Sequence, residues 1–135
     1  MDLALANKVI EGSLVKAKEL GRNFSIVVLD EGGHLVAAQR MEGANFLTPD
    51  IAIGKAYGCV AFGRTSAQLV EMATRNPTFI TALVEMTNGK MVAALGGARL
   101  ILDGRLIGSV GASGATAEQD QEVADAGAVA AGLAG

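Results

Sequence analysis

The first residues of the chain carry apolar side chains at the spacing of an amphipathic helix. Between residues 3 and 20 these positions lie one, three or four apart and share one helical face: Leu3, Ala6, Val9, Ile10, Leu14, Ala17 and Leu20. Gly21 follows directly, at the position where glycine commonly ends a helix. The pattern therefore predicts a helix over 3–20.

Two β-rich runs come next, over 24–30 and 34–41, separated by a short link that contains two glycines. Such a link between two strands is typical of a hairpin. The first run is apolar at every position from Ile26 to Leu29. A strand that is apolar on both faces is usually covered on both sides, so we expect layers above and below the sheet.

A helix is predicted from Thr48 to about Phe62, with Thr48 as its N-cap, Pro49 in its first turn and Gly63 at its end. Two further glycines, at 54 and 58, fall on one face of this helix. They indicate that a strand, a neighbouring subunit or a ligand approaches closely there, and a sheet is the favoured partner.

The next helices are marked by their N-terminal residues. Thr65 and Gln68 form a capping box for a helix that ends near Thr74, and Asn76-Pro77 predicts further helical turns up to Met86.

Three strands and a last helix complete the predicted order. The strands are 91–95, 98–102 and 105–113, and Asp103-Gly104 is a strong hairpin turn between the last two. A capping box of Thr116 and Gln119 opens a helix over 116–133. The result is a single domain over 1–135 of α/β (α+β) class, with five mainly antiparallel strands and helices on both faces.

Composition removes several function classes. Half of the residues are apolar, 19% are charged and the net charge is −3, which argues for a folded core and against a nucleic-acid-binding protein. No stretch is apolar enough to span a membrane, and the start lacks the basic flank of a signal peptide. A single cysteine excludes an internal disulfide and a cysteine-rich metal site. The expected location is the cytoplasm.

Three segments give the chain a family resemblance: VVLDEGGHLVAAQRMEGA, DIAIGKAYGCVAFGRTS and GARLILDGRLIGSVGASGATAEQDQEVADAG. Together they resemble the GlcG/HbpS-like family, which includes the C-terminal domain of PduO, over residues 3 to 131. The resemblance implies a profilin-like three-layer α/β/α sandwich and a homo-oligomer. It also implies haem or another tetrapyrrole as a ligand in some members. The match is poorest between residues 64 and 96, so the ligand here is expected to differ from those of relatives.

Lys55 and Arg64 are the leading candidates for binding or catalysis. Apart from Asp50 in the first turn, Lys55 is the only charged residue of an otherwise largely apolar helix, so it either pairs with a carboxylate or binds an anionic ligand. Arg64 follows that helix, where a guanidinium binds either the last helical carbonyls or a ligand carboxylate.

The remaining candidates are weaker. His34, the only histidine, is favoured as a residue of the hairpin turn over a haem ligand, and Arg40 is expected to pair with Glu42 or Glu118. Cys59 and Tyr57 are alternative iron ligands in principle, but a buried cysteine is usually inert. No metal site is predicted.

The glycine-rich run 108–114 lacks the spacing of a nucleotide-binding loop. What remains is the loop of Ser113, Gly114 and Thr116, which precedes a helix N-terminus and is predicted to hold one anionic group. The favoured function is an oligomeric protein that binds a small anionic ligand, haem included. The alternatives are a small lyase or isomerase that uses Lys55 and Arg64, and an accessory subunit without chemistry.

Overall fold

A four-stranded antiparallel sheet in the order β2-β1-β4-β3 lies at the centre of the computed structural model, which describes all 135 residues. Its strands are β1 (Ser25–Asp30), β2 (Leu35–Arg40), β3 (Gly97–Leu102) and β4 (Arg105–Ser113). The two predicted hairpins, β1–β2 and β3–β4, are present, and β1 pairs with β4 to join them. At the second turn, Asp103 and Gly104 both adopt positive φ, as a two-residue hairpin turn requires.

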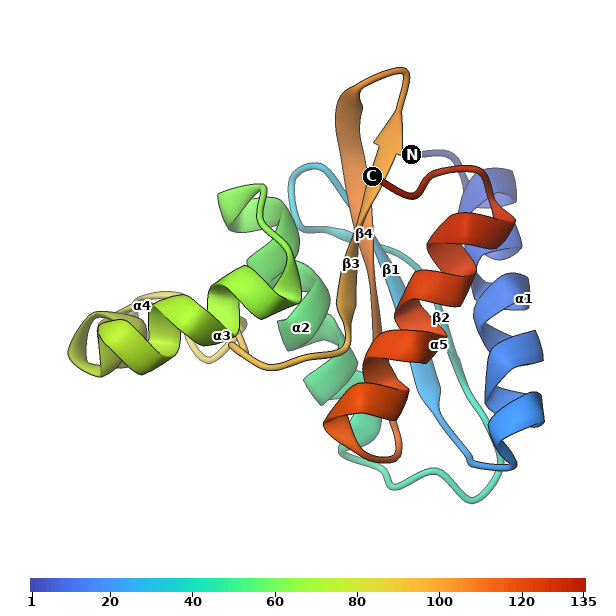
Figure 1. The fold of residues 1–135 in the computed structure, drawn as a ribbon, viewed down its shortest axis with the longest axis horizontal. Helices are drawn as coiled ribbons and strands as arrows, with labels where there is room; N and C mark the ends of the chain where they lie inside the picture. The colour runs from blue at the N-terminus through green and yellow to red at the C-terminus, as the bar shows by residue number, and fades with distance from the viewer.

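Helices cover both faces of this sheet (Figure 1). On one face α1 (Leu3–Leu20) packs beside α5 (Ala117–Ala130), and on the other lies α2 (Thr48–Phe62). The larger core lies under α1 and α5, where Phe24, Ile26 and Val110 are fully buried. A smaller cluster, with Val27, Leu29 and Ala52, lies under α2. The predicted α/β/α arrangement is therefore confirmed.

Two short helices, α3 (Ser66–Arg75) and α4 (Pro77–Met86), extend away from the sandwich as an arm (Figure 1). The predicted capping box of Thr65 and Gln68 starts α3, with both reciprocal hydrogen bonds present. No helix of the chain has the length and apolar character needed to cross a membrane.

The prediction of a fifth strand at 91–95 is wrong. This segment is irregular and packs against the glycine face of α2, where Val92 lies over Gly54, and Met91 lies beside Leu69 of α3 over Gly58. The Val92 backbone N–H donates to the Gly54 carbonyl at 3.0 Å. The close partner of Gly54 and Gly58 is thus neither the sheet nor a ligand, and Gly96 does not join two strands.

The prediction that Thr48 caps α2 is also wrong. Thr48 is the first helical residue, and the N-cap, Leu47, makes no side-chain cap. The Thr48 hydroxyl donates instead to the Asn45 carbonyl at 2.7 Å and pairs with the Ser25 hydroxyl at 2.8 Å. Thr48 therefore ties the start of α2 to the start of β1.

Candidate functional site

Lys55 forms a buried ion pair with Asp120. Lys55 comes from α2 and Asp120 from the first turn of α5, so the pair joins helices from opposite faces of the sheet. The distance between Lys55 Nζ and Asp120 Oδ2 is 2.6 Å, and the two side chains are 5% and 6% exposed. Lys55 also donates to the Ala112 carbonyl at 3.3 Å. Of the two roles predicted for Lys55, pairing with a carboxylate is the one present in the structure.

The other oxygen of Asp120 holds the loop between β4 and α5. Asp120 Oδ1 accepts hydrogen bonds from the backbone N–H groups of Gly114 and Ala115, each at 3.0 Å. Thr116 caps α5 by accepting from the Gln119 backbone N–H at 3.2 Å, as predicted. The free N–H groups of the loop are therefore occupied by a side chain of the protein itself.

An open cleft of about 520 Å³ lies at this end of the sheet, where four segments meet. They are the residues after α1, the loop before α2, the first turn of α2, and the end of β4 with the residues that follow it. The lining residues are Gly21, Arg22, Asn23, Gly43, Ala44, Asn45, Leu47, Thr48, Ile51, Ser113, Gly114 and Ala115. We call this the end cleft, and its volume is within the range of small-ligand pockets.

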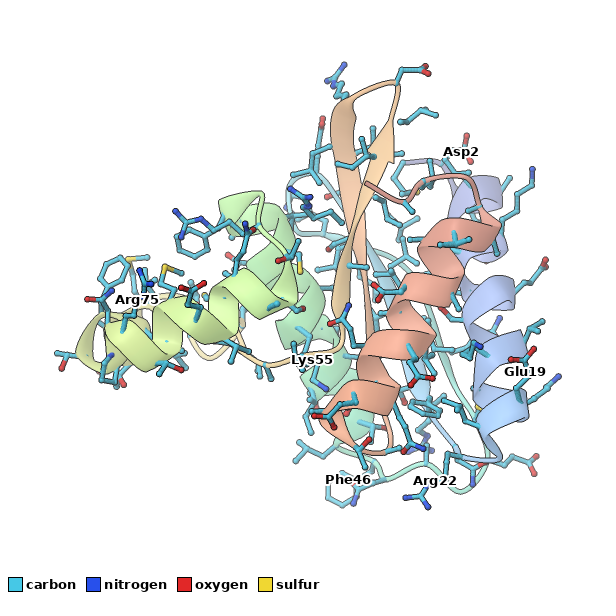
Figure 2. All side chains as sticks on the ribbon, viewed as in Figure 1. Asp2, Glu19, Arg22, Phe46, Lys55 and Arg75 are labelled. Carbon is cyan, nitrogen blue, oxygen red and sulfur yellow. The ribbon has the colours of Figure 1, made fainter.

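The lining of the end cleft combines one cation and several polar residues with two larger apolar side chains. Arg22 is the only charged residue that lines it, and Leu47 and Ile51 supply apolar surface. Phe46, between two lining residues of the loop, is 81% exposed. Arg22 and Phe46 lie at the same end of the molecule (Figure 2). A single positive charge beside apolar surface suits an amphipathic ligand that bears a carboxylate.

The predicted pair of Lys55 and Arg64 is not brought together. Lys55 lies in the middle of α2, whereas Arg64 follows the C-cap glycine at its end, about two helical turns away. Arg64 is exposed and donates to the Met72 sulfur at 3.5 Å. Arg64 lines a different depression, on the arm, with Gln68, Glu71 and Arg75.

Neither His34 nor Arg40 lines the end cleft. The His34 side chain is 81% exposed, with its Nδ1 3.4 Å from Asp30 Oδ1. The hydrogen bond from the His34 backbone N–H, more than any other contact, lowers the pKa of the Asp30 carboxyl. Arg40 is exposed, and the predicted ion pair with Glu42 or Glu118 is absent.

The end cleft contains no residue suited to coordinate haem iron. Its lining includes no histidine, cysteine, tyrosine or methionine. His34 lies beyond the far end of β1, about 16 Å along the strand from Ser25. Cys59 is fully buried, and that burial raises the pKa of its thiol. The lining of the end cleft therefore offers no side chain that could hold the iron of a haem group.

Two predicted residues do line the end cleft, namely Ser113 and Gly114. No sequence motif pointed to Arg22, Asn23, Asn45 and Leu47, which come from segments far apart in the chain. The signal that was available is the pair of short segments at 21–23 and 43–45, each of which contains a glycine and an asparagine between predicted elements.

The family comparisons cover nearly the whole chain. A family model described as "Haem degrading protein HbpS-like" matches residues 1–129. The GlcG protein of Escherichia coli is 33% identical over 110 residues, which are 81% of this chain and 78% of that protein. An uncharacterised 15.0 kDa protein of Citrobacter freundii, from the dhaT-dhaS intergenic region, is 31% identical over 124 residues, 91% of this chain and 86% of that protein.

Solved structures show the same fold. The Klebsiella pneumoniae protein ORFY superposes with a TM-score of 0.89 at 26% identity, over 98% of this chain and 90% of that one. PduOC in a complex with haem superposes with a TM-score of 0.86 at 26% identity, over 96% of this chain and 94% of that one. A double mutant of HbpS from Streptomyces reticuli superposes with a TM-score of 0.85 at 25% identity, over 96% of this chain and 85% of that one.

Proposed function

This chain belongs to the HbpS-like family, and on that premise we propose that it is a small-molecule-binding protein for haem or a related carboxylated tetrapyrrole. The haem complex of the similar protein PduOC supports this ligand class. The end cleft is the proposed site, and the observation that carries the proposal is its single charged residue, Arg22, beside apolar surface.

The proposed contacts match the shape of the ligand. A tetrapyrrole has a flat apolar body and carboxylates at one edge. Leu47, Ile51 and the exposed Phe46 offer apolar contact for the body. The Arg22 guanidinium offers a charge-assisted hydrogen bond for a carboxylate. Lys55 is not a direct contact in this proposal, because Asp120 already neutralises it.

The experiment is a haem titration followed by Soret absorbance. We expect saturable binding that weakens about five- to tenfold in Arg22→Ala, since one charge-assisted hydrogen bond is lost. Arg75→Ala is the matched control, because Arg75 lies on the arm (Figure 2), where it is exposed and pairs with Glu71. Equal affinity in Arg22→Ala and the wild type, or an equal loss in both variants, would remove the end cleft from the proposal.

Self-association is the second part of the proposal. The arm carries two large apolar side chains in solvent, Phe79 at 51% and Met86 at 71% exposed. Exposed apolar surface of this kind supports a contact between copies of the chain. Native mass spectrometry tests it: we expect a dimer or larger assembly that shifts toward monomer in Phe79→Ser. A cytoplasmic location stays a prediction.

A further inference from the structure

Ser113 stands apart from the other buried serines of the protein. Ser13, Ser66 and Ser109 each donate a side-chain hydrogen bond to a backbone carbonyl, at 2.8, 2.9 and 2.7 Å respectively. Ser25 pairs with the Thr48 hydroxyl. Ser113 is 5% exposed as a residue, and its hydroxyl makes no hydrogen bond within the chain but is still reached by solvent. It is the only one of the five buried serines in this condition.

The free hydroxyl of Ser113 belongs to the end cleft. Ser113 is the last residue of β4, and its backbone is opposite Ser25 in the sheet. Its side chain lines the end cleft together with Arg22. No group of the protein uses this hydroxyl, and it is not shielded from solvent, so it is available to donate a hydrogen bond to a ligand in the cleft.

The charges around the end cleft indicate that the ligand group bound there is an anion. Arg22 is the only charged residue in the lining. The nearest carboxylate beneath the cleft is Asp120, whose Oδ1 accepts from Gly114 and Ala115 and whose Oδ2 pairs with Lys55. Because Lys55 offsets its charge, Asp120 does not repel an anion that enters. Asp50 and Glu118 are exposed residues of the two adjoining helix starts and do not line the cleft.

We propose that the end cleft recognises its ligand by a carboxylate, which accepts hydrogen bonds from the Ser113 hydroxyl and the Arg22 guanidinium, and that recognition is independent of iron. The second clause follows from the lining, which holds no side chain able to coordinate haem iron. Lys55 then acts as a positioning residue through Asp120. This inference rests on the proposed function and names the ligand group that the site reads.

Three ligands test carboxylate recognition and the independence of iron separately. They are haem, metal-free protoporphyrin IX, and the dimethyl ester of that porphyrin. Binding is measured by absorbance for haem and by fluorescence for the other two. We expect haem and the free acid to bind the wild type within about threefold of each other. We expect the ester to bind at least about tenfold more weakly, because its carboxylates no longer carry charge.

The variants locate the contact. Ser113→Ala is expected to lower the affinity for the free acid about five- to tenfold and to leave the affinity for the ester unchanged. Because no hydrogen bond within the protein is lost, its melting temperature should not fall. Ser13→Ala is the matched control: it removes a bond to the Val123 carbonyl, so it lowers the melting temperature and leaves both affinities unchanged.

The outcomes distinguish the two proposals. Haem that binds more than about tenfold tighter than the metal-free acid would overturn the iron-independent mode and leave the proposed function intact. If the Ser113→Ala variant binds the free acid as tightly as the wild type, this inference is overturned and the proposed function is left intact. Failure of all three ligands to bind the wild type would overturn both.

Discussion

Replacing Lys55 by methionine is expected to be among the most destabilising single changes in this protein. Methionine keeps most of the apolar stem and removes the charge. The variant leaves the Asp120 side chain buried, at 6% exposure, and without its cation. Removal of one partner from a buried ion pair typically costs about 3–5 kcal/mol. A chain of this length has an unfolding entropy near 0.28 kcal/mol/K, so the melting temperature should fall by about 10–18 °C.

A double variant tests whether the missing charge is the cause. Lys55→Met combined with Asp120→Asn removes both charges, and the Asn side-chain oxygen still accepts from the Gly114 and Ala115 backbone N–H groups. We expect it to be more stable than Lys55→Met alone, since a neutral pair in place of a buried ion pair is often tolerated. The assay is urea unfolding followed by circular dichroism, with equal m-values required. A loss below about 1 kcal/mol in Lys55→Met, or a double variant less stable than either single one, would refute this reasoning.

Three further predictions follow from other parts of the molecule. Gly111→Ala should destabilise the chain by about 1–3 kcal/mol in the same unfolding assay, because a Cβ there would overlap the Ala52 carbonyl of α2; an unaffected midpoint would contradict the packing of α2 on β4. The lowered pKa of Asp30 means that its charged form stabilises the fold. That contribution is present above about pH 4 and is lost as the pH falls through the lowered pKa. Asp30→Asn should therefore flatten the acid limb of the stability–pH curve. Acid limbs of equal slope in the wild type and the variant would count against this reasoning. The raised pKa of the Cys59 thiol means that stability declines as the pH rises beyond about 9. The native thiol should therefore resist a disulfide reagent at pH 8 and react once unfolded, and rapid native labelling would show that the thiol is not buried.

The sequence pattern predicted most of the secondary structure because the chain marks its own element ends. Gly21 ends α1 in the left-handed conformation, and the capping boxes at Thr65 and Thr116 start α3 and α5. These are local signals, decided within four residues of the position concerned. The error at 91–95 has a different cause. Apolar residues show that a segment is buried, but not that its backbone pairs with a strand, and Val92 bonds to α2.

The candidate site was less predictable because its parts are distant in the chain. Ser113 and Gly114 were found from a glycine-rich loop before a helix. Arg22 belongs to no motif, and only the fold brings its loop beside the loop before α2. The ion pair of Lys55 was predicted as one of two roles, but its partner was not, since Asp120 is 65 residues away.

Amide chemical-shift mapping with metal-free protoporphyrin IX tests the central claim most directly, because the ring current of a diamagnetic porphyrin shifts the amides nearest to it. We predict that the shifted amides belong to residues 22–23, 43–48 and 113–115, which surround the end cleft. Residues 31–34, at the other end of β1, should not move. Shifts centred on His34 or on the arm, with the end cleft unchanged, would contradict the account.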